Sequence, residues 1–204
     1  MTDTRTTVLK VATKLFSKKG YDGVSMRNIA NEVKISAPAL YNHFSDKQSL
    51  YLTAIAETFE NKSSQILQIV KGSGKPIKRL ENMIHLHCTL MHDDPDFRRL
   101  MQRELVDGDE KRLAYMAQEV FAPAITGIKE LLKELKPDCD ANSLIVTIIG
   151  MMHKHFELEP LMRFFEDAES DQADSFQNKS SQINPDYITN QVMDVLLPFL
   201  GEKK

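Results

Sequence analysis

Apolar residues recur at helical spacing along most of the chain. Near the N-terminus they follow one another at intervals of three and four positions, which predicts an amphipathic helix that ends at Gly20. No run of alternating apolar and polar residues is flanked by turn signals, so the sequence predicts no sheet. The predicted fold class is therefore all-α. The first apolar stripe consists of Val8, Val11, Ala12, Leu15 and Phe16.

Two short helices are predicted next, and a tight turn at Lys34-Ile35 separates them. Ser25 is a suitable N-cap for the first helix and Ser36 for the second. Pro38 falls in the first turn of the second helix, where no intrahelical N–H donor is needed. Such a pair of helices is typical of a helix-turn-helix, whose second helix lies in the major groove of DNA.

The rest of the chain predicts longer helices. The first of them covers residues 46–70, and the sequence Gly72-Ser73-Gly74-Lys75-Pro76 ends it. Pro123 is expected to kink or split one of the helices beyond this break. A polar loop is expected over residues 166–184. The later predicted helices cover residues 76–92, 95–107, 110–136, 140–160 and 185–200.

Charge is distributed unevenly along the 204 residues, whose net charge is −3. Residues 1–48 contain eight Lys and Arg against four acids, a balance of +4, which leaves −7 for the rest of the chain. A basic N-terminal part on an acidic body is typical of a protein that binds a polyanion such as DNA.

Other features exclude several classes of protein. The two cysteines, Cys88 and Cys139, form no disulfide pattern, and the N-terminus has no apolar stretch of a signal peptide, so we expect a cytoplasmic protein. The longest apolar run, Leu144–Met152, is far shorter than the roughly 20 residues that span a bilayer. We find no Gly-rich phosphate loop, nucleophile elbow or His-Glu-x-x-His motif, and therefore expect no enzyme.

The outward side of the second short helix suits the major groove, because it is small or polar and no acid lies between Glu32 and Asp46. Asn42 can form paired hydrogen bonds with adenine, and alanine or proline can contact a thymine methyl group. Lys47, at a helix N-terminus, suits a backbone phosphate. The predicted DNA contacts are Ser25, Arg27, Lys34, Ser36, Ala37, Pro38, Ala39, Tyr41, Asn42, His43 and Lys47.

At these residues the chain resembles the TetR (tetracycline-repressor-like) family of bacterial transcription regulators. The resemblance implies a homodimer with a three-helix head that binds palindromic operator DNA. It also implies a larger C-terminal domain that binds a small molecule and dimerises. The matching elements are Ala12-x-x-Leu15-Phe16, Gly20-Tyr21, Ser25-x-x-x-Ile29-Ala30, Ile35-Ser36, Leu40-Tyr41-x-His43-Phe44 and Lys47-x-x-Leu50.

Two positions depart from the family pattern. Lys34 stands where the turn usually has glycine, so this residue must either adopt a left-handed backbone or form a different turn. Ala37-Pro38 replaces a Lys-Gly pair at the start of the recognition helix, which removes one cation. Following the resemblance, we expect a DNA-binding domain over residues 1–48 and an effector-binding and dimerisation domain over residues 49–204, connected by the helix 46–70.

The resemblance also assigns roles to the C-terminal helices. The last two long helices are expected to form a four-helix dimer interface, although their apolar stripes could equally be intramolecular core. The expected interface residues are Leu144, Ile145, Ile148, Ile149, Tyr187, Ile188, Val192, Val195, Leu196 and Phe199. The effector pocket is expected between Pro76 and Phe165. Its candidate lining residues are Met83, His87, Met91, Leu100, Met101, Leu105, Met116, Phe121, Met152, Phe156 and Phe165.

The predicted function is a ligand-responsive transcriptional regulator, in most cases of this kind a repressor, which a small-molecule effector releases from DNA. No other cofactor is expected. One alternative is a helical small-molecule carrier without DNA binding. Another is a metal-sensing regulator of the same family, since His85, Cys88 and His92 share one helix face at spacings of three and four residues.

Overall fold

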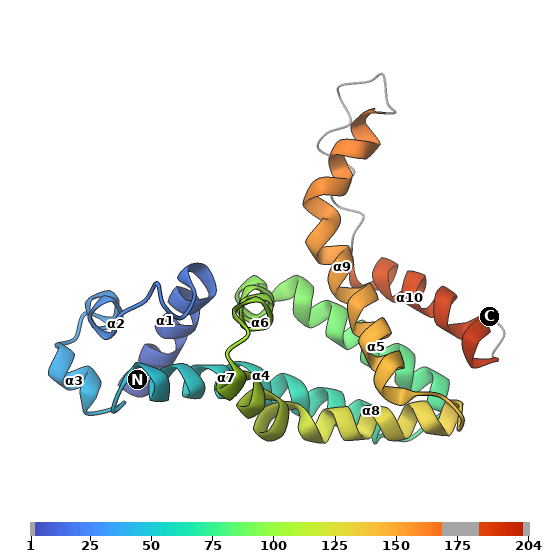
Figure 1. Ribbon diagram of the computed structural model, residues 1–204, viewed down its shortest axis with the longest axis horizontal. Helices are drawn as coiled ribbons and strands as arrows, with labels where there is room; N and C mark the ends of the chain where they lie inside the picture. The colour runs from blue at the N-terminus through green and yellow to red at the C-terminus, as the bar shows by residue number, and fades with distance from the viewer. Residues whose placement is uncertain (1–2, 169–183, 202–204) are drawn as a thin grey trace. The chain divides into compact units, whose positions relative to one another are not determined.

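The computed structural model describes residues 3–168 and 184–201, and all regular secondary structure in these ranges is helical, as predicted (Figure 1). Among the described residues, no helix is both long and apolar enough to cross a membrane. The helices are α1 (Thr4–Lys19), α2 (Met26–Val33), α3 (Ala37–Tyr41), α4 (Lys47–Val70), α5 (Pro76–Asp93), α6 (Pro95–Asp107), α7 (Glu110–Tyr115), the π-helix η1 (Met116–Phe121), α8 (Ala122–Leu135), α9 (Ala141–Ala168) and α10 (Pro185–Leu200).

The helix predicted over residues 110–136 is divided, as the proline at 123 indicated. The interruption lies just before this proline, in the π-helix η1, and Pro123 takes the second position of α8. Proline provides no N–H group, and its ring clashes with the carbonyl group four residues earlier in a regular α-helix. A wider π turn at this place moves that carbonyl group away from the ring.

The helix predicted to end at residue 160 continues to Ala168, with Pro160 inside it. That predicted end is therefore wrong, because a proline disfavours but does not forbid the continuation of a helix. The predicted loop over residues 166–184 must accordingly begin later than expected. Most of it, residues 169–183, lies outside the described residues.

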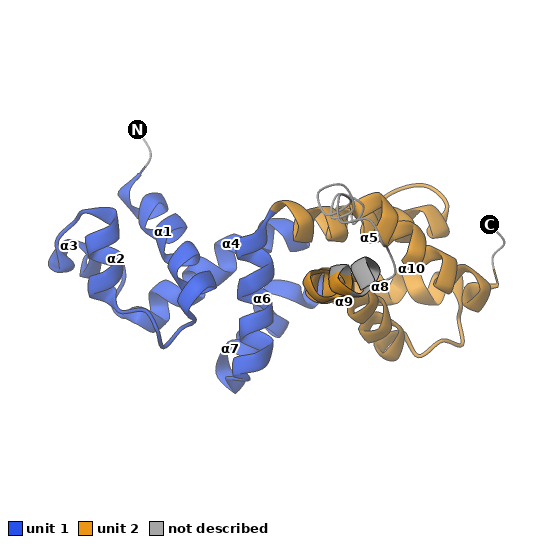
Figure 2. Cartoon of the chain, turned by 90° about the horizontal axis from the view of Figure 1, so that it is seen from above, with its two compact units in different colours: residues 1–64, 94–123 blue, residues 65–93, 124–204 orange. Residues whose placement is uncertain are grey.

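The described chain packs into two compact units (Figure 2). Unit 1 comprises Met1–Ser64 and Asp94–Pro123, and unit 2 comprises Gln65–Asp93 and Ala124–Lys204. This division follows packing and differs from the expected functional division at residue 48. The helices α6, α7 and η1 pack with the N-terminal head rather than with the rest of the C-terminal part.

Unit 1 joins the three-helix head to α6 through polar contacts at the end of α1. Arg103 in α6 donates from Nε to the carbonyl oxygen of Ser17 at 2.9 Å and from Nη2 to that of Lys18 at 2.7 Å. The Ser17 hydroxyl donates to Asp96 at 2.7 Å. The last carbonyl groups of a helix have no intrahelical partner, so Arg103 satisfies two acceptors that α1 cannot. Fully buried apolar side chains of unit 1 include Val8, Phe16, Ile29, Leu40, Leu50 and Phe59.

Unit 2 has its own hydrophobic core, to which α5, α8, α9 and α10 contribute. The apolar stripe of α10 packs on α5 and α9, and Gly127 of α8 lies against Val70 so closely that a Cβ atom would come within 2.8 Å of it. Buried members of this core include Leu80, Ile84, Leu131, Leu132, Ile148 and Met152.

Two histidines form a pair within unit 2, in which His153 is buried and His87 is partly buried. The Nε2 atoms of His87 in α5 and His153 in α9 are 3.0 Å apart, and the rings stack with an interplanar angle of 13°. Burial and, as the smaller cause, the charge of His153 together lower the pKa of His87 from 6.5 to about 3. Burial also lowers the pKa of His153. The charge of Glu157 raises this pKa and the charge of Lys154 lowers it, but burial is the largest effect. Both rings are therefore neutral in the folded protein at neutral pH.

We expect the free energy of unfolding to fall as the pH decreases below about 6.5. The unfolded chain takes up protons at these two histidines near their ordinary pKa, whereas the folded chain does not until a lower pH. Above that pH both states are neutral and this contribution is constant. The slope is at most about 1.4 kcal/mol per pH unit for each histidine.

Urea denaturation at several pH values between about 5 and 7.5 measures this slope. The double variant His87→Gln/His153→Gln keeps polar side chains that cannot titrate. The slope of its unfolding free energy against pH should therefore be smaller, by at most about 1.4 kcal/mol per pH unit for each histidine removed. If the variant and the unchanged protein gave the same slope, the two histidines would not be the cause.

Candidate nucleic-acid interface

The first helix of the turn motif, α2, begins with a capping box. The backbone N–H of Asn28 donates to the Ser25 hydroxyl at 3.1 Å, and the backbone N–H of Ser25 donates to the Asn28 side chain at 3.0 Å. These two bonds satisfy donors that the first turn of a helix leaves free. Met26, Ile29 and Ala30 are buried, while Arg27 is exposed beside the cap.

The turn between α2 and α3 has the geometry that usually requires glycine. Lys34 adopts a left-handed backbone with φ 62° and ψ 43°, and its N–H bonds back to the carbonyl groups of Ala30 and Asn31. A residue with a Cβ atom adopts this conformation at some cost in free energy. Of the two alternatives that the sequence left open at Lys34, the structure has the left-handed one, and the lysine side chain is exposed.

The recognition helix α3 is short and amphipathic. The Ser36 hydroxyl accepts from the N–H of Ala39 at 3.2 Å and caps the helix, as predicted. Leu40 is fully buried and fixes the helix to the head, whereas Tyr41 is 51% exposed. Asn42 and His43 follow in the turn after the helix, and both are exposed.

The next helix, α4, starts at Lys47, so this lysine lies at a helix N-terminus, as predicted. Its cap is Asp46, whose carboxylate accepts from the N–H of Ser49 at 2.7 Å. This bond, assisted by one from the Ser45 hydroxyl, lowers the pKa of Asp46. The ammonium group of Lys47 lies 4.0 Å from the centre of the Tyr21 ring.

None of the eleven predicted DNA contacts is buried. Ala37, Ala39 and Lys47 are partly exposed, and the others are exposed. These residues thus form a continuous outward surface of small, polar and basic groups around α2, α3 and the start of α4. Such a surface is free to approach the major groove and the adjoining phosphates.

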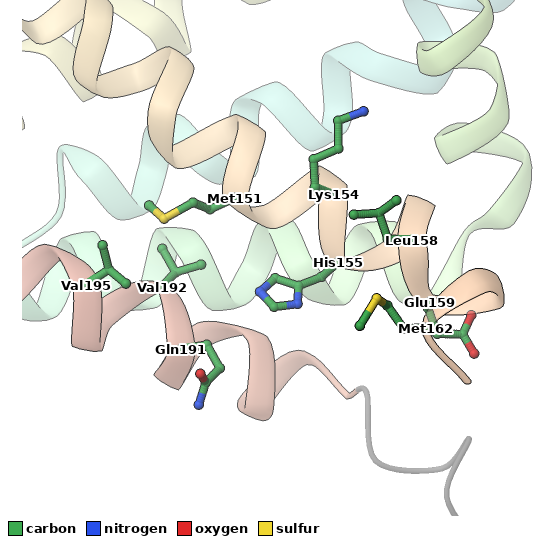
Figure 3. Close-up of a pocket in the computed structure, with 9 residues that line it drawn as sticks. All are labelled: Met151, Lys154, His155, Leu158, Glu159, Met162, Gln191, Val192 and Val195. Atoms are coloured by element: carbon green, nitrogen blue, oxygen red, sulfur yellow. The ribbon is translucent and has the colours of Figure 1, made fainter. Parts of the chain in front are cut away.

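A second feature lies in unit 2, where α9 and α10 leave an apolar groove of about 430 Å³ between them (Figure 3). His155 and Leu158 of α9 and Val195 of α10 are among its walls, and the His155 ring packs edge-on against Tyr187. The sequence did not single out the α9 part of this groove. Its lining residues are Met151, Lys154, His155, Leu158, Glu159, Met162, Gln191, Val192 and Val195.

The ten expected interface residues fall into two groups. Tyr187, Val195 and Phe199 are exposed on α10, and Ile149 is partly exposed. The other six belong to the buried core of the protomer itself, so for them the intramolecular alternative holds: Leu144, Ile145, Ile148, Ile188, Val192 and Leu196. Val146 is exposed on α9 as well, although it lies outside the apolar spacing of its neighbours and is not among the expected residues.

The expected effector-pocket residues are divided between the two units. Met83, His87, Met91, Met152 and Phe156 belong to unit 2, and Leu100, Met101, Leu105, Met116 and Phe121 belong to unit 1. Within the units most of them are buried or partly buried, but Leu105 is 60% exposed on α6. The side chain of Phe165 lies outside the described part of the chain. The pocket therefore stays a prediction.

The residues behind the metal-sensing alternative do not converge. His85 bonds to Asp186 at 2.9 Å, and His92 bonds to its neighbour Asp93 at 2.7 Å. Burial raises the pKa of the Cys88 thiol to about 12, so the thiol is protonated at neutral pH. Across the described ranges, no three His, Cys, Asp or Glu side chains are placed to hold one metal ion.

The basic three-helix head and the outward surface of α3 define the class of protein, a helix-turn-helix DNA-binding protein with a helical C-terminal part. Residues 8–54 match the family of bacterial regulatory proteins described as the tetR family. The N-terminal head of the chain therefore matches this family of regulatory proteins, which confirms the resemblance found in the sequence.

Individual relatives agree with this assignment. The chain is 25% identical over 173 residues to the nucleoid occlusion factor SlmA of Marinomonas sp. (strain MWYL1), a match that covers 78% of this chain and 88% of that protein. It is 27% identical over 89 residues to the HTH-type transcriptional regulator HbdR of Aromatoleum sp. (strain CIB), covering 44% and 39% of the two chains.

Among solved structures, the fold is similar to that of the transcriptional regulator FadR from Bacillus subtilis in complex with stearoyl-CoA. The TM-score is 0.70 with 15% sequence identity, and the match covers 94% of this chain and 96% of that chain. At this identity the similarity shows the fold alone.

Proposed function

We propose that this regulator is a homodimeric, ligand-responsive repressor that a small-molecule effector releases from a palindromic operator. The observation that carries the proposal is the outward surface of α3 and of the turn after it, where Tyr41, Asn42 and His43 are exposed and no acid lies between Glu32 and Asp46. The basic balance of residues 1–48 supports it, because the attraction of DNA phosphates dominates the affinity of such proteins.

Within this proposal the surface residues divide by role. Asn42 reads a base edge, with adenine as its best partner. Lys47, at the N-terminus of α4, binds a phosphate together with the positive end of the helix. Ser25, Arg27 and Lys34 contact the backbone on the other side of the recognition helix, where they set register rather than sequence preference.

A second copy of the chain is the proposed occupant of the groove between α9 and α10. A large exposed apolar patch marks an interaction surface, and Val195, Phe199 and Tyr187 of α10 continue the groove with exposed apolar side chains. A two-fold dimer also provides what the DNA requires, since two recognition helices must reach half-sites about 34–36 Å apart, one turn of the double helix.

The proposed effector is an apolar or amphipathic small molecule. Its support is indirect: the ten methionines of the chain repack easily around such ligands, and the similar FadR structure holds stearoyl-CoA. An effector shifts the population of the DNA-binding arrangement only if its affinity differs between the two arrangements. Stearoyl-CoA is therefore the first compound to test for release of DNA.

A salt titration with duplex DNA separates the regulator from a helical carrier without DNA function. The logarithm of the binding constant should fall with the logarithm of salt concentration, with a slope of about −0.9 per neutralised phosphate. Lys47→Ala should reduce this slope by about one unit and leave sequence preference unchanged. Lys75→Ala, an exposed lysine of unit 2, is the matched control and should leave the slope unchanged.

Two results would argue against the proposal. A flat salt response of the unchanged protein would favour the carrier. If Lys47→Ala and Lys75→Ala reduced the salt slope of DNA binding equally, Lys47 would not be a specific phosphate contact.

A further inference from the structure

Unit 1 contains a buried ionic cluster that the DNA-binding surface does not explain. Glu104 of α6 is 0% exposed. Its carboxylate accepts hydrogen bonds from the Tyr51 hydroxyl of α4 and from Nε of Arg112 in α7, the latter at 2.9 Å. A carboxylate without water is stable only where such partners compensate for its lost hydration.

Arg112 extends this cluster toward the head. Its guanidinium group lies 4.8 Å from the centre of the Tyr21 ring and 5.5 Å from that of Tyr51. Asp107 and Asp109 lie 3.6 and 3.7 Å from its other nitrogens. Burial alone would lower the pKa of Arg112, but the bond and charge of Glu104 outweigh this effect and raise it, so the group stays cationic.

The Tyr21 ring is held by its neighbours on several sides. It packs edge-on against Tyr51 with centroids 4.9 Å apart and stacks beside Phe16 at 6.3 Å. Lys47 places its ammonium group over the same ring, 4.0 Å from the centroid. Cations are attracted to the face of an aromatic ring, so a fixed ring also restricts the lysine that approaches it.

We propose that Tyr21 is a positioning residue for DNA binding, which holds the Lys47 ammonium group ready for a phosphate, and that the buried Glu104–Arg112 pair fixes the Tyr21 ring. This inference rests on the proposed DNA contact of Lys47. A free lysine side chain loses much rotamer freedom when it binds phosphate, and restricting it in advance reduces that loss. If the Glu104–Arg112 pair fixes the Tyr21 ring, the DNA affinity of the N-terminal helices also depends on this contact between α6 and α7.

A double-mutant cycle with Tyr21 and Lys47 tests the proposal. The probe is a random-sequence duplex of about 30 base pairs, or three turns, titrated by fluorescence anisotropy at about 0.1 M salt. Tyr21→Leu should raise Kd about two- to fivefold when Lys47 is present, because the unrestrained lysine side chain then loses more rotamer freedom on binding. In the Lys47→Ala background the same substitution should leave Kd unchanged. Tyr21→Phe keeps the ring face and should bind as the unchanged protein does.

A spectroscopic measurement tests the geometry in the full chain without DNA. Protons on the Lys47 side chain that lie over an aromatic ring resonate upfield, so its terminal methylene signal should be shifted in the unchanged protein and in Tyr21→Phe. The shift should be absent in Tyr21→Leu. The triple variant Tyr51→Phe/Glu104→Met/Arg112→Met removes the buried polar groups together and should weaken the shift while keeping the fold.

The outcomes separate this inference from the proposed function. If the unchanged protein binds the duplex with a steep salt response but Tyr21→Leu weakens binding equally with and without Lys47, Tyr21 acts through the fold and the inference is wrong. An unshifted Lys47 signal in the unchanged protein would also overturn it. Absence of any salt-dependent binding would instead remove the proposed function itself.

Discussion

Replacing Val195 with glutamate is expected to convert the proposed dimer to a monomer and to weaken binding to a two-half-site duplex by about 10²–10⁴-fold. Val195 is 61% exposed on α10 and lines the apolar groove. In a two-fold dimer each copy presents the same surface, so the substitution places two carboxylates in one largely apolar interface, where they lose hydration. The loss in DNA affinity follows because the second head no longer binds as part of the same molecule.

Sedimentation velocity measures the first effect, and a titration with a duplex carrying two half-sites measures the second. Val106→Glu is the matched control, because Val106 is 84% exposed and belongs to unit 1, whereas the α9–α10 groove belongs to unit 2. It should leave the dimer intact. If the Val195→Glu protein remained dimeric and bound DNA as the unchanged protein does, α10 would not be part of the dimer interface.

Replacing Arg112 with methionine is expected to destabilise the protein by about 3–5 kcal/mol. The substitution leaves the carboxylate of Glu104 buried without its cation, and breaking a buried ion pair on one side has a cost of this size. The Tyr51 hydroxyl would still donate to Glu104, but a single neutral donor does not balance the charge. Urea denaturation at neutral pH, followed by circular dichroism, measures the difference in the free energy of unfolding.

Two variants show whether burial is the reason. Arg99→Met removes an exposed ion pair with Asp96 and should change stability by less than about 1 kcal/mol. The triple variant Tyr51→Phe/Glu104→Met/Arg112→Met replaces all members of the cluster by apolar groups and should recover most of the loss. If Arg112→Met were no more harmful than Arg99→Met, the pair would contribute little to unit 1.

The elements of the DNA-binding head could be predicted from the sequence because their determinants are local. Ser25 and Ser36 cap the two short helices within three residues of the groups that they bind. Leu40 faces inward because its neighbours on the opposite side are small or polar. The all-helical class followed in the same way, from periodicity that holds over one or two turns.

Features that depend on distant partners could not be predicted. Glu104 is buried because Tyr51, 53 positions away, and Arg112 meet it, and no local pattern marks any of the three. His87 and His153 are 66 positions apart, and no spacing along a single helix relates them. For the same reason the apolar stripe of α10 could not be divided in advance into core and exposed residues.

The central claim is that two copies of the α3 surface read one two-fold symmetric DNA site. Selection of duplexes from a random library by the purified protein, followed by sequencing, tests it most directly. We expect an inverted repeat whose half-sites are about 10–10.5 base pairs apart, or a multiple of this spacing, and we expect Asn42→Ala to relax the preference at one base pair in each half. Recovery of no enriched sequence, or of a site without two-fold symmetry, would contradict the account.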